Sequence, residues 1–331
     1  MKISIAMTTY NGEAYIEKQI ISILNQTRKV DEIIICDDCS TDDTVTILEH
    51  VLQREKCSYC HLVINDTNLG YKKNFRKSIE MTSGDLIFLC DQDDIWESEK
   101  IELVEKLFSK NKKIYALNSA FTLIDGQDKT ISYKNRRGFL NHDMIRGKAG
   151  NNELVHIPYS MVLRYNISPG CTMAFRKDIK ESYLKYTKSM LPHDWEINLL
   201  SGMKDGCYFL NKPLIRYRIH GKNTLGMNTN DHLSVLHFEK DIDFRVRAIK
   251  EKMALISIVE KWHKRLQIKE KELKQYRKIK TYDMLREKVV CHHRIDLWFP
   301  LLAMTLALWD GKYVRFKVLF GDLFYAIRRA R

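Results

Sequence analysis

The stretch SGDLIFLCDQDDIW, residues 83–96, holds a short apolar run that leads directly into three aspartates. A run of this length, residues 85–90, is typical of a strand buried in a sheet. In open parallel sheets, ligands bind just beyond the carboxyl ends of the strands. The stretch therefore predicts a buried strand and, at Asp91, Asp93 and Asp94, a ligand site beside it.

Outward from this stretch, strands and helices alternate through the first half of the chain. The run IIIC at 33–36 is continuous and apolar, as expected of a parallel strand covered on both faces. The predicted strands are 2–7, 33–36, 61–65 and 85–90, and the predicted helices are 13–26, 41–53, 72–82 and 97–110. This order predicts an α/β fold with a central, mostly parallel sheet flanked by helices.

The pattern is looser after residue 113. Further strands are predicted at 114–124 and 207–219, and further helices at 178–188 and 194–203. Residues 126–160 are rich in glycine, asparagine and charge, and we expect a mobile loop there. From about residue 231 the chain is predicted to be helical. We expect two domains, residues 1–228 and a basic, helical C-terminal region at residues 229–331.

Composition and charge indicate a folded chain with a basic end. Of the 331 residues, 44% are hydrophobic and 29% charged, which is typical of globular rather than disordered proteins. The net charge is +13, and residues 241–331 contain 22 lysines and arginines against 11 aspartates and glutamates. Eight cysteines suit free thiols in a reducing compartment, and no signal peptide is recognisable, so we expect a cytoplasmic protein.

The acidic cluster favours a metal ion. Asp91 and Asp93 lie two residues apart, and carboxylates packed this closely repel one another unless a cation lies among them. A hard divalent ion with oxygen ligands, Mn²⁺ or Mg²⁺, suits such a cluster and can bridge to a diphosphate. The alternative is an acidic turn that caps the helix starting near Ser98.

The first two predicted strands also end in polar residues. Thr8, Tyr10 and Asn11 follow the first strand, and Asp37 and Asp38 follow the second. These ends should meet at one edge of the sheet. There Tyr10 can stack on a pyrimidine base while Asp38 accepts the N–H of its ring. The alternative is that one of the two aspartates caps the next helix.

Several motifs resemble, in the same order, those of family 2 glycosyltransferases, in particular bacterial members described as rhamnosyltransferase-like. The motifs are TTYNG (8–12), IICDDCSTDDT (34–44), NLGYKKNF (68–75), SGDLIFLCDQDDIW (83–96), PHDW (192–195) and YRIHGKN (217–223). They cover roughly residues 1–225. The resemblance implies a Rossmann-like nucleotide-binding domain of the GT-A type. It also implies inverting transfer of a sugar from a UDP- or dTDP-sugar, with dTDP-rhamnose favoured.

The resemblance assigns roles to particular residues. The positions assigned to the nucleotide-sugar are Thr8, Tyr10, Asn11, Asp38 and Asp91. Asp93 is assigned to the metal, and Asp194 to the general base that takes the proton of the acceptor hydroxyl. Asp194 lies in the first helical turn after Pro192, where the helix dipole is expected to lower its pKa, which does not help a base.

His220 and Arg218 are further candidates. A neutral His220 imidazole can complete the metal shell or touch the diphosphate, and Arg218 can offset phosphate charge. The alternative for His220 is a strand-end histidine that bonds to backbone.

The basic C-terminal region predicts a membrane contact. Residues 261–280, KWHKRLQIKEKELKQYRKIK, are predicted to form one cationic helix. Residues 294–329 mix aromatic and apolar residues with lysine and arginine, which resembles a helix lying on an anionic membrane surface. A peripheral position at the inner face of the membrane suits a lipid-linked glycan acceptor. The alternative is a hairpin packed on the core. Nucleic acid is not an expected partner, because the chain contains no recognised nucleic-acid motif.

Two other functions remain open. A sugar-phosphate nucleotidyltransferase would use a similar sheet and metal, but it should carry a glycine-rich loop after the first strand, where TTYNGEAYI has one glycine. A non-enzymatic basic scaffold on membrane or nucleic acid would make the strand-end aspartates dispensable.

Overall fold

The computed structural model describes residues 1–220, 242–266, 268–308 and 316–329. The chain divides into two compact units, Met1–Asn223 and Thr224–Arg331. The predicted boundary between residues 228 and 229 lies in the segment 221–241, outside the described residues.

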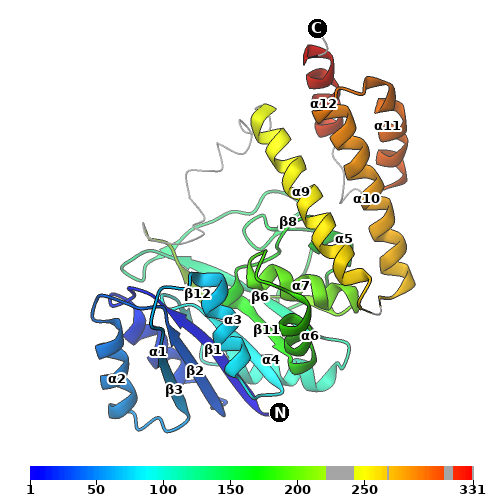
Figure 1. The fold of residues 1–331 in the computed structure, drawn as a ribbon. Coiled ribbons are helices and arrows are strands. Elements are labelled where there is room, and N and C mark those ends of the chain that lie inside the picture. The colour runs from blue at the N-terminus through cyan, green and yellow to red at the C-terminus, as the bar shows by residue number, and fades with distance from the viewer. Residues whose placement is uncertain (221–241, 267, 309–315, 330–331) are drawn as a thin grey trace. The chain divides into compact units, whose positions relative to one another are not determined.

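The N-terminal unit is built on a large mixed sheet (Figure 1). Its four parallel strands are β1 (Ile3–Thr9), β2 (Glu32–Asp37), β3 (Cys60–Ile64) and β4 (Leu86–Cys90), adjacent in the order β3-β2-β1-β4. Every residue of β1 and β4 is buried, which explains their continuous apolar sequence. The predicted mostly parallel sheet flanked by helices is thereby confirmed.

Beyond β4 the sheet becomes mixed. It continues through β11 (Met173–Arg176), β6 (Ala116–Ile124), β12 (Cys207–Arg218) and β10 (Leu154–His156), with β5 (Ile95–Trp96) on β12 and β7 (Thr130–Ile131) on β6. β11 is antiparallel to both of its neighbours, whereas β12 is parallel to β6.

The loop predicted at 126–160 is more ordered than expected. It contains β7, the hairpin β8 (Phe139–Leu140) and β9 (Ile145–Arg146), β10 and the start of α5 (Tyr159–Val162). Ile145, Ile157 and Tyr159 are buried, and this burial fixes a segment whose polar composition predicts mobility.

Helices cover both faces of the sheet. The helices α1 (Ile16–Leu24) and α2 (Thr44–Arg54) contact one another, and α3 (Tyr71–Met81) contacts β1, β2, α6 (Lys177–Tyr186) and α7 (His193–Met203). Right-handed crossovers place α1 and α2 on one face and α3 on the other, because the chain reverses its direction across the sheet after β3. α4 (Lys100–Lys110) follows β5.

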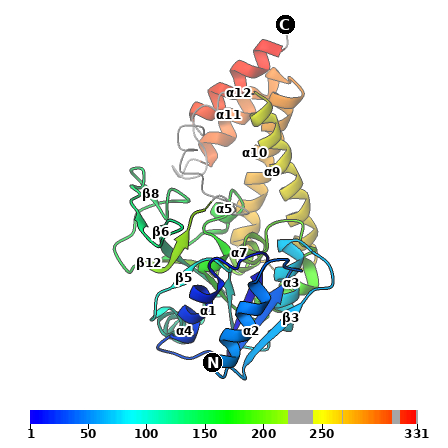
Figure 2. The ribbon, with the colours of Figure 1, turned by 90° about the vertical axis from the view of Figure 1, so that its left-hand side faces the viewer.

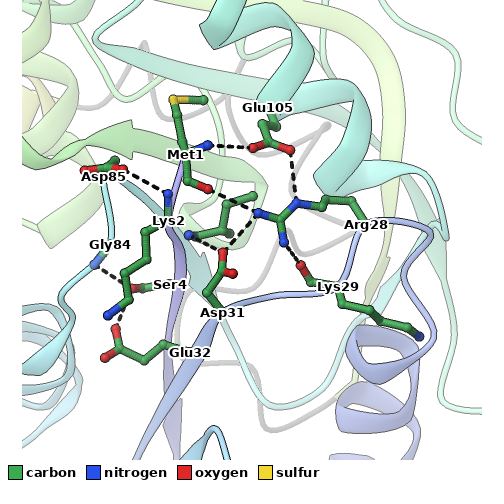
Figure 3. A network of polar contacts seen from close by, with 11 residues as sticks. Met1, Lys2, Ser4, Arg28, Lys29, Asp31, Glu32, Gly84, Asp85 and Glu105 are labelled. Atoms are coloured by element: carbon green, nitrogen blue, oxygen red, sulfur yellow. Dashed lines mark hydrogen bonds and ion pairs between the residues drawn. The ribbon is translucent and has the colours of Figure 1, made fainter.

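A polar network holds the amino edge of the sheet (Figure 3). The Met1 ammonium donates to Glu105 of α4 at 3.0 Å, and Arg28 bonds the same carboxylate at 3.2 Å. Arg28 also bonds Asp31, which accepts the Ile3 N–H at 2.8 Å. These contacts fix the start of β1 against β2 and α4, so that the opposite ends of the strands meet in a defined register.

Gly84 lies between α3 and β4. The helix predicted over 72–82 ends at Met81, with Thr82 after it in an extended conformation. A Cβ on Gly84 would lie 2.5 Å from Ser4 Oγ and 2.9 Å from Lys2 O. Glycine is therefore required for the close approach of β1 and β4 at this edge (Figure 3).

The C-terminal unit, taken by itself, consists of helices. They are α9 (Ile242–His263), α10 (Glu270–Cys291), the short 3₁₀ turn η2 (Ile295–Leu297), α11 (Trp298–Ala307) and α12 (Phe316–Arg329). Among the residues described, none of the helices is long and apolar enough to span a bilayer.

The predicted helix over 261–280 is wrong, because α9 ends at His263 and α10 begins at Glu270. The two helices lie side by side as a hairpin (Figure 2). The His263 and Tyr276 rings are 4.1 Å apart, and Lys280 Nζ lies 2.5 Å from a Glu260 oxygen. Folding back buries Trp262 and Tyr276, which one straight helix would leave in water.

Candidate active site at the carboxyl edge of the sheet

The ends of β1 and β2 are tied to one another. Thr9 Oγ1 donates to Asp37 Oδ2 at 2.6 Å, and the same carboxylate accepts the N–H of Ser40 at 2.8 Å. Asn11 accepts the N–H of Thr41 at 2.8 Å through its side-chain oxygen, and its own N–H donates to Ser40. Asp37 and Asn11 therefore shape the turn after β2, and Asn11 lies beside the edge where we predicted nucleotide binding.

Neither of the paired aspartates caps α2, because Asp43 occupies the cap position of that helix. Asp38 instead holds the loop before α3. It is 2% exposed and accepts bonds from Asn65 Nδ2 (2.9 Å), Leu69 N (2.7 Å) and Gly70 N (2.8 Å). A carboxylate has about four acceptor positions. Described residues use three of them, which leaves one on Oδ2 for the predicted bond to a base.

Tyr10 is the exposed aromatic residue of this edge. This residue is 47% exposed, as a stacking surface requires, while Thr8, two residues earlier, is nearly buried. Gln92 bonds the Tyr10 backbone twice, accepting its N–H at 2.7 Å and donating to its carbonyl at 2.9 Å. A Cβ on Gly12 would lie 2.4 Å from Gln92 Oε1, so a side chain there would displace Gln92 from this position. Gln92 joins the ends of β1 and β4, a role that the sequence analysis missed.

The aspartates after β4 form a compact acidic cluster. Ligand atoms of Asp91, Asp94 and Cys171 lie within 4.8 Å of one another. Burial raises the pKa of Asp91 well above its usual range, and the neighbouring Asp93 and Asp94 charges raise it further. Burial and Asp93 likewise raise the pKa of Asp94. The alternative of a helix cap is wrong, because β5 follows the cluster and Glu99 occupies the cap position of α4.

This donor set fits a hard divalent cation. The mutual repulsion of the carboxylates is what a cation would relieve, and carboxylate oxygens are the ligands that Mn²⁺ and Mg²⁺ prefer. Cys171 is a weaker candidate ligand, because burial and the nearby Asp94 and Asp91 charges raise its thiol pKa and keep it protonated. The oxygens of Asp91, Asp93 and Asp94 therefore suit the ion better than the sulfur does.

The structure brings Asp93 and His220, the predicted metal ligands, together. His220 Nε2 lies 2.9 Å from Asp93 Oδ2, so this nitrogen faces a carboxylate rather than the backbone. Arg218 is fully buried and bonds Asp93 O through Nε (2.7 Å) and Asp94 Oδ1 through its N–H (3.0 Å). Its side chain thus supports the aspartate turn and does not present a surface to phosphate, contrary to our expectation.

A buried lysine lies behind the acidic cluster. Lys100 of α4 donates to Cys171 O at 2.8 Å, and its Nζ is 3.6 Å from the centre of the Trp96 ring. Burial lowers the pKa of Lys100 to about 8, although Asp94 and Asp91 oppose the shift. Trp96 is buried and part of the core. The helix that contains Lys100 was predicted from its periodicity, but the sequence does not show that this side chain lies toward the acidic cluster.

Asp194, the predicted base, lies at the start of α7 after Pro192. It is 6% exposed and accepts bonds from Trp195 N at 2.9 Å and from Asn166 Nδ2 at 2.7 Å. Burial raises its pKa from 3.8 to about 6, against both hydrogen bonds. The expected lowering by the helix terminus is wrong, because desolvation outweighs it. A carboxylate with this pKa is ionised at neutral pH and basic enough to accept a proton.

An amide chain supports Asp194. Asn166 Oδ1 accepts bonds from Asn198 Nδ2 (3.2 Å) and Ile167 N (3.1 Å), which leaves its Nδ2 to face Asp194. Asn118 Nδ2 in turn donates to Asn198 Oδ1 at 2.9 Å. The amides come from β6, α7 and the loop before η1 (Gly170–Thr172). None of the three amides was predicted, since no spacing in the sequence connects them.

The turn η1 lies against both the base and the acidic cluster. A Cβ on Gly170 would lie 2.9 Å from His193 Nε2 and 3.4 Å from Asp194 Cβ, so glycine permits this close approach. The ligand atom of the next residue, Cys171, lies within 4.8 Å of those of Asp91 and Asp94. The predicted base and the aspartates after β4 therefore share one neighbourhood.

Comparisons with known proteins agree with this geometry. The sequence profile described as Glycosyl transferase family 2 matches residues 4–168. The dTDP-rhamnosyl transferase RfbG of Shigella flexneri is 27% identical over 235 residues, which are 67% of this chain and 74% of RfbG. The UDP-Glc:alpha-D-GlcNAc-diphosphoundecaprenol beta-1,3-glucosyltransferase WfgD of Escherichia coli is 34% identical over 110 residues, 33% of this chain and 42% of WfgD.

Solved structures share the fold. S. aureus TarS superposes with a TM-score of 0.59 at 15% identity, over 99% of this chain and 53% of TarS, so the chain spans about half of that protein. TarS 1–349 in complex with UDP-GlcNAc gives 0.57 at 16% identity, over 100% and 93%. Mannosyltransferase PcManGT from Pyrobaculum calidifontis, in complex with GDP-Man and Mn²⁺, gives 0.54 at 14% identity, over 99% and 86%.

Proposed function

This chain is a glycosyltransferase with a family 2 domain, and from that premise we propose that it transfers a sugar from a UDP- or dTDP-sugar, with inversion, to a hydroxyl of a lipid-linked glycan. The observation that carries the proposal is the position of Asp194. A buried carboxylate with a pKa of about 6 stands beside η1, whose other side borders the acidic cluster. An acid–base group next to a diphosphate site is the minimum that this reaction requires.

The nucleotide would lie across the ends of β1 and β2. Tyr10 offers its exposed ring for stacking on the base, and Asp38 has an acceptor position for the N–H of a pyrimidine. Thr8 and Asn11 border the same edge. Asp91 would face the sugar-phosphate end, because it follows β4 next to β1.

Asp91, Asp93 and His220 would hold Mn²⁺ or Mg²⁺, which in the bound state stabilises the charge that develops on the leaving diphosphate. The chain's own contribution is to hold the carboxylates in place. Arg218 does this through Asp93 O and Asp94 Oδ1, while Lys100 holds the neighbouring Cys171 O.

Asp194 would act on the acceptor. Asn166 and the Trp195 N–H orient its carboxylate, and burial makes it basic enough to take the hydroxyl proton as that oxygen attacks the anomeric carbon. The proton then stays on Asp194 until the product leaves.

The names of the relatives support the proposed classes of donor and acceptor. RfbG is described as a dTDP-rhamnosyl transferase, which favours dTDP-rhamnose, whereas WfgD uses UDP-Glc and TarS 1–349 was solved with UDP-GlcNAc. The WfgD acceptor is a diphosphoundecaprenol-linked sugar, which supports a lipid-linked acceptor and a place in bacterial surface polysaccharide synthesis.

A donor titration tests the proposal. We expect one UDP- or dTDP-sugar, among UDP-, dTDP- and GDP-sugars, to bind in calorimetry with an affinity that rises when Mn²⁺ is added. Asp93→Asn should lose the Mn²⁺-dependent part of binding. Asp85→Asn is the matched control, because Asp85 accepts the Lys2 N–H at the opposite edge of the sheet. Binding that Asp93→Asn leaves unchanged contradicts the metal assignment, and no binding by any donor contradicts the function.

A further inference from the structure

The last two helices of the C-terminal unit carry an exposed apolar patch. Five large side chains there are strongly exposed: Phe299 (73%), Leu306 (57%), Phe320 (57%), Phe324 (58%) and Ile327 (44%). They are half of the large hydrophobic side chains that are exposed among the described residues. A contiguous patch of this kind marks a binding surface more often than chance exposure does.

The patch has a defined orientation on α12. Phe320, Phe324 and Ile327 are spaced four and three residues apart, so they share one face of the helix. The opposite face contains Leu319, Asp322 and Ala326, all buried. α12 therefore turns Asp322 inward and the rings of Phe320 and Phe324 outward, the reverse of an ordinary surface helix.

The inward charge is neutralised within the unit. Arg286 of α10 bonds Asp322 through Nε at 2.6 Å and through Nη2 at 3.3 Å, a bidentate pair. This pair fixes the rotation of α12, so the outward position of the rings is a consequence of the fold. Between residues 318 and 327 the outward face carries no charge.

α11 extends the same surface. Trp298 lies 6.0 Å from Phe320 and 5.4 Å from Phe299, measured between ring centres. The aromatic residues of the two helices thus form one cluster, which we call the α11–α12 face: Phe299, Leu306, Phe320, Phe324 and Ile327.

We propose that the α11–α12 face inserts into the interfacial region of a membrane with anionic lipids. The face is apolar and aromatic. The sequence of residues 309–331 contains six lysines and arginines and two acids, one of which, Asp322, is paired with Arg286. Rings that enter the headgroup boundary, with cations beside anionic headgroups, are the pattern of a helix lying on a membrane.

The helices fit an interfacial rather than a spanning position. Among the described residues, none qualifies as a membrane span, and α11 and α12 have 10 and 14 residues. The bilayer core requires about 20 residues. Membrane binding by this face does not depend on the proposed sugar transfer. If both hold, the enzyme would reach its lipid-linked acceptor from the membrane surface.

Vesicle binding by the full chain tests the inference. We expect co-sedimentation with phosphatidylcholine vesicles that contain phosphatidylglycerol, and weaker binding without the anionic lipid. Phe320→Ser with Phe324→Ser should weaken binding by about 100-fold or more, because each buried phenylalanine accounts for about 10- to 100-fold. Phe320→Trp with Phe324→Trp should keep binding, since tryptophan favours the interface.

The matched control is Ile64→Ser with Met81→Ser, which removes two exposed apolar side chains from the N-terminal unit. It should bind vesicles like the unchanged protein. Equal vesicle binding by the Phe320/Phe324 serine variant overturns the inference. The inference is also overturned if the original chain binds no vesicles but forms a dimer in sedimentation, and the serine variant does not. The face is then a contact between two copies. Calorimetry of nucleotide-sugar binding on the same samples shows whether the proposed function holds, whatever the outcome of the vesicle experiment.

Discussion

Asn166→Leu isolates the contribution of one hydrogen bond to the basicity of Asp194. The change keeps the approximate volume of the side chain and removes the Nδ2 group that donates to Asp194 Oδ2 at 2.7 Å. That bond lowers the pKa of Asp194 against the larger effect of burial. A hydrogen bond to a charged group contributes about 1.5–3 kcal/mol, and about 1.4 kcal/mol corresponds to one pH unit.

The pKa of Asp194 should therefore rise from about 6 to between about 7 and 8. A general base must be ionised, so the acid limb of kcat/KM for sugar transfer should move upward by the same amount. At pH 6 the variant should be slower by about 5- to 50-fold, and at pH 9 the two enzymes should approach parity. Donor affinity should not change.

The assay measures transfer of a radiolabelled sugar to lipid-linked acceptor across pH 5–9. Asn211→Leu is the matched control, because it removes a half-buried amide that bonds Gly150 O at 3.0 Å, away from Asp194. Asn166→Asp should move the limb further upward, since it places a second carboxylate beside the first. An acid limb that stays in place in Asn166→Leu, or a loss of rate that is equal at every pH, refutes the reasoning.

Two other predictions concern stability. Asp194→Asn should raise the free energy of unfolding at pH 8 by up to about 3 kcal/mol, because the folded chain holds an ionised carboxylate whose pKa is about 6 instead of 3.8. This gain in the free energy of unfolding should shrink as the pH falls from 6 toward 4. Urea unfolding of both proteins at pH 8 and at pH 4 would show whether it does. Arg286→Met should destabilise the C-terminal unit by about 3–5 kcal/mol, because it removes the guanidinium from buried Asp322. Adding Asp322→Leu should recover most of that loss in thermal unfolding, and a double variant no more stable than the single one would contradict the pairing.

The fold was predictable because its determinants are local. Continuous apolar runs at β2 and β4 and the alternation with amphipathic helices specify a parallel sheet, and the strand ends specify where a ligand site must lie. Asp91, Asp93 and His220 were singled out in this way, since Asp91 directly follows β4 and the other two lie within three residues of the end of a strand.

What the sequence did not disclose depends on tertiary contacts. The pKa of Asp194 reversed its expected direction because burial is not visible from helix position. Gln92, Asn166 and Lys100 act through partners on other elements, about 30 to 80 residues away in the sequence, so the spacing within a motif does not reveal their roles. The helix break before Glu270 follows from packing of α9 on α10, which overrides the local preference of a charged sequence.

The central claim is that Asp194 is the base of a sugar transfer whose donor binds independently of it. The most direct measurement compares donor affinity and transfer rate in the unchanged enzyme and in Asp194→Asn, with the same donor and Mn²⁺. We predict equal donor affinity and a rate lower by about 10²- to 10⁴-fold. A rate within a few fold of the original, or a loss of donor binding, would contradict the account.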